Sequence, residues 1–115
     1  TSLFVDPDEA MIRLSHALGA DAIELHTGTY AHHPDDPAPL RALDAAAALA
    51  ASLGLAVHAG HGLTVANVGP VAAIPECEEL NIGHHLVSRA LFDGLAAVVR
   101  TMRAEMDRAR AALTP

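Results

Sequence analysis

Residues 56–62 read Ala-Val-His-Ala-Gly-His-Gly, a short apolar run that opens directly into a histidine between two glycines. Four times along the chain, a short apolar run is followed by turn residues and then by a longer helical pattern. These runs are Leu3 to Val5, Ala22 to Leu25, Ala56 to Ala59 and Leu80 to Ile82. This alternation is typical of parallel strands joined by helices. It predicts an α/β fold of four βα units.

The strand ends are where we expect the functional residues. Successive predicted strands lie about 20 to 35 residues apart, which suits βαβ units. Four such units indicate half of an eight-stranded barrel or a small doubly wound sheet, and both place function at the carboxyl ends of the strands. Half of the eight histidines fall at or next to these ends, namely His26, His58, His61 and His84.

Capping residues predict where the helices begin and end. Asp6 is expected to be the N-cap of the first helix, with Glu9 at the third helical position. Residues 29–37 are predicted to form a polar loop, and an alanine-rich helix is expected over 39–53. Gly94 is expected to break the last helical segment.

The composition excludes several classes of protein. The 115 residues, 51% hydrophobic and 3% aromatic, fit one globular domain or part of one. The net charge of -7 disfavours nucleic-acid binding, and no apolar run reaches the roughly 18 residues of a membrane span. All seven basic residues are arginine, so this chain cannot form a lysyl Schiff base. Cys77 is the single cysteine, which rules out an internal disulfide and favours the cytoplasm.

His61 is the strongest candidate for a catalytic residue. Its neighbouring glycines leave room for a ligand to approach the backbone. Histidine titrates near neutral pH, so its imidazole can donate a proton to a leaving oxygen. The alternative is a structural histidine that is bonded to the backbone of a tight turn.

Glu24 and the Gly83-His84 pair are further candidates. Glu24 lies in an apolar strand, so we expect it to be largely buried and to need a partner. Its carboxylate could stabilise developing positive charge, or it could form a structural ion pair with an arginine. Gly83-His84 lies between a strand and a helix, a place where backbone N–H groups bind phosphate.

A zinc site is an alternative use of the same side chains. His58, His61 and Glu24 could bind zinc and make the protein a zinc-dependent hydrolase. However, His58 and His61 are three residues apart, and alternation along a strand sends such side chains to opposite faces. His58 is therefore expected to be a packed or hydrogen-bonded residue of the sheet.

Four motifs together resemble a known family. They are Ser-Leu-Phe-Val-Asp-Pro-Asp at 2–8, Ile-Glu-Leu-His-Thr-Gly at 23–28, Ala-Gly-His-Gly-Leu at 59–63 and Glu-Leu-Asn-Ile-Gly-His at 79–84. With them the chain resembles the C-terminal half of the pyridoxine 5'-phosphate synthases, which close the ring of vitamin B6.

The resemblance implies a TIM (β/α)8 barrel, of which residues 1–115 form a single partial domain that supplies strands five to eight. It also implies a homo-oligomer. The family's general-base histidine and glutamate, and most contacts to one substrate, belong to the N-terminal half. These 115 residues alone are therefore expected to be inactive.

The resemblance also implies the reaction. The family condenses 1-deoxy-D-xylulose 5-phosphate with 3-amino-2-oxopropyl phosphate and releases inorganic phosphate and water. The substrate's own amine forms the imine, so no cofactor and no metal is needed, in agreement with the absence of lysine.

Residue by residue, His61 matches the family's proton donor and Glu24 its transition-state stabiliser. Gly62, Gly83 and His84 match positions that bind 3-amino-2-oxopropyl phosphate. His58 departs from the family pattern, which has asparagine there.

A different hypothesis is a phosphate-binding half-barrel that pairs with a second copy of itself, because its first and last strands would have unpaired edges.

Overall fold

A computed structural model describes residues 1–113. The strands are β1 (Ser2–Val5), β2 (Ala22–His26), β3 (Ala56–Gly60) and β4 (Cys77–Asn81). The helices are α1 (Glu9–Ala17), α2 (Gly28–His32), α3 (Ala38–Ser52), α4 (Val68–Ala72), α5 (His84–Asp93) and α6 (Leu95–Ala111). The strands form a parallel sheet in the order β1-β2-β3-β4. The predicted α/β fold with a parallel sheet is therefore confirmed.

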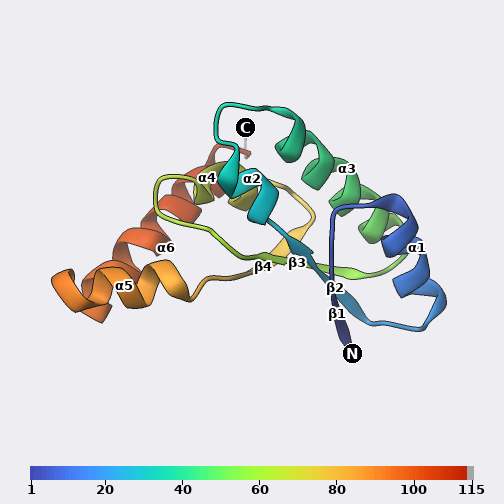
Figure 1. Cartoon of the computed structure of the whole chain (residues 1–115), viewed down its shortest axis with the longest axis horizontal. Helices are drawn as coiled ribbons and strands as arrows, with labels where there is room; N and C mark the ends of the chain where they lie inside the picture. Colours follow the sequence, from blue (N-terminus) through green and yellow to red (C-terminus); the bar gives the residue numbers. More distant parts are fainter. Residues whose placement is uncertain (114–115) are drawn as a thin grey trace.

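One face of the sheet forms the hydrophobic core. Ile23, Leu25, Val57 and Ala59 are at most 2% exposed and belong to one cluster with apolar residues of α1 and α3. Figure 1 shows α1, α3, α4 and α6 gathered on this side of the strands. Burial of one such aliphatic side chain contributes about 1.5–3 kcal/mol, so this face accounts for much of the stability.

The opposite face carries a polar row and remains open. The strand register places Phe4, Glu24, His58 and Glu79 side by side across the sheet. Phe4 is 56% exposed, and the Glu79 side chain is exposed to the same extent. These side chains alternate with the core residues along the strands, so they lie on the face of the sheet opposite the core.

Glycines follow two of the helices, and Gly94 breaks the last helical segment as the sequence predicts. Gly54 follows α3 with φ +85°, and Gly94 separates α5 from α6 with φ +83°. Left-handed conformations of this kind cost glycine little, because it has no Cβ.

Three local predictions were wrong. The N-cap of α1 is Asp8, not Asp6, and its side chain accepts a hydrogen bond from the Ala10 N–H at 2.8 Å. A turn in which the Asp8 N–H bonds the Asp6 carbonyl delays the start of this helix. Residues 28–32, predicted to be mostly loop, form α2. β4 begins at Cys77, three residues before the apolar run, because strand pairing uses backbone groups and tolerates polar side chains on the open face.

No helix among the described residues is both long enough and apolar enough to cross a membrane.

Candidate active site

The carboxyl ends of β2, β3 and β4 border a cavity of about 590 Å³. Its lining includes all five residues selected from the sequence: Glu24, His61, Gly62, Gly83 and His84. They come from three successive βα units whose strands are neighbours in the sheet. The structure thus brings the predicted site residues together at one end of the sheet.

Glu24 is half-buried rather than largely buried, and its partner is not an arginine. Its Oε1 accepts a hydrogen bond from the Asn81 Nδ2 at 2.8 Å. Asn81 ends β4 and also lines the cavity. An amide donor leaves the negative charge of the carboxylate uncompensated, which keeps it available to a cationic group in the cavity.

Gly60 makes this contact possible. It lies on β3, between the strands of Glu24 and Asn81, and pairs directly with Asn81. A Cβ at this position would lie 2.8 Å from the Glu24 Oε2 and 2.8 Å from the Asn81 carbonyl oxygen. Only glycine fits here without displacing the carboxylate or the neighbouring strand.

His61 has an unusual backbone conformation. Its φ is +92°, in the left-handed region, and Gly62 follows with φ +74°. The Thr27 hydroxyl donates a hydrogen bond to the His61 carbonyl at 2.5 Å, and Thr27 is fully buried. Such a conformation costs a non-glycine residue of order 1–3 kcal/mol and persists only where its surroundings enforce it. Thr27 is therefore part of what holds His61 at the rim of the cavity.

The His61 ring stacks on the ring of His26. The ring centroids are 4.6 Å apart and the planes differ by 27°. His26 ends β2, so the stack links the ends of two neighbouring strands.

Gly83 and His84 begin α5. Gly83 is the N-cap, and it provides no side chain to accept hydrogen bonds from the first turn. Both residues are exposed at the cavity. The first N–H groups of a helix lack partners within the helix, so they can bind an anion such as a phosphate group.

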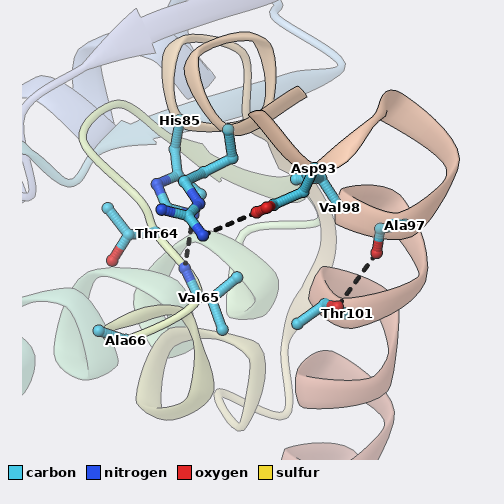
Figure 2. Close-up of a pocket in the computed structure, with 9 residues that line it drawn as sticks. Thr64, Val65, Ala66, His85, Asp93, Ala97, Val98 and Thr101 are labelled. Carbon is cyan, nitrogen blue, oxygen red and sulfur yellow. Dashed lines mark hydrogen bonds and ion pairs between the residues drawn. The ribbon is translucent and has the colours of Figure 1, made fainter. Parts of the chain in front are cut away.

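A second cavity of about 540 Å³, whose lining residues are drawn in Figure 2, shares part of its lining with the first. Thr64 and His85 line both cavities. The His85 Nε2 accepts a hydrogen bond from the Val65 N–H at 3.3 Å, and this bond ties the loop after β3 to α5. Arg89 and Asp93, which also line the second cavity, form an ion pair.

The described part of the chain offers no set of ligands for the zinc site that was the alternative hypothesis. Within residues 1–113, no group of three or more His, Cys, Asp or Glu side chains could hold a metal ion. His58 lies on the open face of the sheet, with its Nε2 3.8 Å from a Glu79 carboxylate oxygen. His58 therefore lies next to Glu79 within the sheet, whereas His61 lies beyond the end of β3.

Sequence reasoning missed the supporting residues. Thr27 and Asn81 lie inside two of the family motifs, but the motifs predict no role for either residue. Nothing in their local sequence shows that each bonds a residue on another strand or loop, 34 and 57 positions away.

Comparison with known proteins identifies the family. The family model described as "Pyridoxal phosphate biosynthesis protein PdxJ" matches residues 1–108. The chain belongs to the PdxJ family. This confirms the resemblance that the motifs carry.

PdxJ relatives match almost the whole chain. The pyridoxine 5'-phosphate synthase of Zymomonas mobilis subsp. mobilis is 54% identical over 112 residues, which are 96% of this chain and 44% of the relative. The synthase of Thioalkalivibrio sulfidiphilus is 54% identical and that of Caulobacter sp. 50% identical, each over 95% of this chain and 46% of the relative. The chain therefore spans about half the length of these curated PdxJ relatives.

Proposed function

We propose that these residues form part of the active site of a pyridoxine 5'-phosphate synthase. The reaction is the condensation of 1-deoxy-D-xylulose 5-phosphate with 3-amino-2-oxopropyl phosphate to pyridoxine 5'-phosphate, with release of phosphate and water. The observation that carries this proposal is the shared cavity, which Glu24, His61, Gly62, Gly83 and His84 line together. The relatives named above bear the same enzyme name.

His61 and Glu24 would carry the chemistry. Ring closure eliminates water, and a protonated His61 at the cavity rim donates a proton to the departing hydroxyl. The Glu24 carboxylate, oriented by Asn81, stabilises positive charge on the substrate nitrogen as it develops. The imine nitrogen comes from the substrate, so the reaction requires no bound cofactor and no metal.

Gly62, Gly83 and His84 would bind the phosphate of 3-amino-2-oxopropyl phosphate. The uncapped start of α5 supplies N–H groups, and the exposed His84 imidazole can add a further donor. Gly62 faces the same cavity from the loop after β3.

The sheet itself would be half of a TIM (β/α)8 barrel. Parallel sheets almost always have both faces covered, yet Glu24, His58 and Glu79 share a face opposite the helix-covered core. In a closed barrel this face lines the interior. Four further strands in the complete protein would supply the remaining catalytic and binding groups. We also propose that the protein is a cytoplasmic homo-oligomer.

The self-pairing half-barrel remains the second candidate. Within the described residues, β1 and β4 each pair on one side only, so both edges can accept another strand. Light scattering on residues 1–115, with and without inorganic phosphate, separates the two ideas. A stable dimer that responds to phosphate favours self-pairing, whereas aggregation or a monomer favours a barrel completed by the same polypeptide.

An assay of the complete gene product with both substrates tests the proposed reaction. His61→Asn should lower turnover by about 100-fold or more, which is the range for loss of a general acid. His16→Asn is the matched control, because His16 is exposed on α1, away from the lining of the cavity. Absence of pyridoxine 5'-phosphate formation, or normal turnover by His61→Asn, would contradict the proposal.

A further inference from the structure

The backbone of His61 is held by a hydrogen bond, whereas its ring is restrained by stacking. The Thr27 hydroxyl fixes the carbonyl, and the left-handed φ of +92° fixes the direction of the side chain from the backbone. Within residues 1–113, no hydrogen bond reaches the His61 imidazole, and the residue is exposed. The contact that restrains the ring is the stack on His26, with centroids 4.6 Å apart.

His26, in contrast, is held from two sides. Its Nδ1 accepts a hydrogen bond from the Gly28 N–H at 3.0 Å. The ring of Phe4, on β1, packs against it edge to face, with centroids 5.0 Å apart and planes at 71°. The acceptor role of Nδ1 places the ring hydrogen of neutral His26 on Nε2.

Gly28 has no side chain, and this leaves room for the His26 ring. A Cβ at Gly28 would lie 2.3 Å from the His26 Cε1 and 3.1 Å from the His61 Cδ2. Both imidazoles therefore occupy the space that a side chain at position 28 would fill. The rings of Phe4, His26 and His61 form a row across the ends of β1, β2 and β3.

We propose that His26 is a positioning residue for His61. The Gly28 N–H and the edge of Phe4 fix the rotation of the His26 ring, and the flat face of this ring then holds the His61 imidazole at the cavity. The inference rests on the proposed function, because it assigns His26 a part in aiming the proton donor of that reaction. A donor whose ring is held needs no reorientation before it transfers its proton.

Two substitutions separate the stack from the hydrogen bond. His26→Asn keeps an acceptor near the position of Nδ1 for the Gly28 N–H and removes the ring. His26→Phe keeps a ring for His61 and removes the acceptor. Both are made in the complete gene product, with His61→Asn to assign the ring signals of His61.

The first readout is the NMR signal of the His61 Cδ2–H, which the neighbouring ring shifts upfield. We expect His26→Asn to move this signal downfield, to the position of an unstacked histidine, and His26→Phe to keep most of the upfield shift. An unchanged signal in His26→Asn overturns the proposal, whatever the enzyme's activity.

The second readout is the split between kcat and KM. Loss of the aromatic pair in His26→Asn should lower kcat by about 3- to 10-fold and leave KM nearly unchanged. The decrease in kcat should be smaller in His26→Phe, which keeps a ring. Wild-type kcat in His26→Asn, or an effect confined to KM, contradicts the proposal. If His61→Asn turns over normally, the proposed function fails, and the NMR shift still decides whether His26 holds the ring.

Discussion

Asn81 donates a hydrogen bond from its Nδ2 to the Oε1 of Glu24 at 2.8 Å, although the two residues stand on strands that are not neighbours. The bond crosses β3 at Gly60, the position where the sheet has no side chain in the way. The carboxylate proposed to stabilise the transition state is thus oriented by a strand two places away.

Loss of the Asn81 amide should reduce activity more than stability. A hydrogen bond to a charged group contributes about 1.5–3 kcal/mol, so Asn81→Ala should lower kcat/KM by roughly 10-fold or more. Steady-state kinetics of the complete gene product check this. Glu78→Ala, an exposed position on the same strand, is the control and should behave as wild type. Full activity of Asn81→Ala would show that Glu24 needs no orientation.

Gly60→Ala should damage both the fold and the site. The added methyl group meets the Glu24 carboxylate and the Asn81 backbone at 2.8 Å, and overpacking of this kind costs about 1–3 kcal/mol of unfolding free energy. Urea unfolding measures the loss. Gly83→Ala is the control for stability: its Cβ would meet nothing within 4 Å, so the unfolding free energy should be unchanged. Equal stabilities of the two variants would refute this account of Gly60.

Thr27→Val should loosen His61. The substitution keeps the shape of a fully buried side chain but removes the hydroxyl that bonds the His61 carbonyl. We expect a loss of about 1–3 kcal/mol in unfolding free energy, together with lower turnover, because the left-handed turn is less firmly held. Thr27→Ser retains the hydroxyl and should keep most of both. Indistinguishable Val and Ser variants would assign the stabilisation to packing instead.

Gly83→Ala should affect the ligand rather than the fold. A Cβ here meets nothing within 4 Å, so the thermal midpoint should match wild type. The methyl group would occupy space at the cavity where we place the phosphate, so the KM for 3-amino-2-oxopropyl phosphate should rise several-fold. An unchanged KM in a stable variant would move the phosphate site elsewhere.

Cys77 should be protected from alkylation in the native protein. Burial raises the pKa of its thiol, and this outweighs the lowering by a backbone hydrogen bond with Glu79 and by the nearby Arg110. A higher pKa means a smaller thiolate fraction at pH 8, and the thiolate is the reactive form. Mass spectrometry of the Cys77 peptide should show slow labelling by iodoacetamide in buffer and fast labelling in urea. Fast labelling of the native protein would mean that this end of β4 opens readily.

Local chemistry explains why the elements could be predicted. Apolar runs followed by Gly or Pro marked the strands and helix ends to within a few residues, because burial and capping depend on residues close in sequence. The errors arose where that signal is weak. The first part of β4 contains Glu78 and Glu79, so it lacks the apolar run that would predict a strand; its pairing depends on backbone groups. Helix α2 has few apolar residues, so its sequence shows no helical pattern.

The sequence by itself determined the α/β fold, its family and five of the residues that line the cavity: Glu24, His61, Gly62, Gly83 and His84. These follow from short motifs whose residues are neighbours along the chain. Only the tertiary structure decided what supports them, because strand register sets which distant groups meet. It joined Asn81 to Glu24, fixed the His61 carbonyl with Thr27 and laid the His61 ring on His26. Each contact links separate βα units, so no local pattern could have shown it.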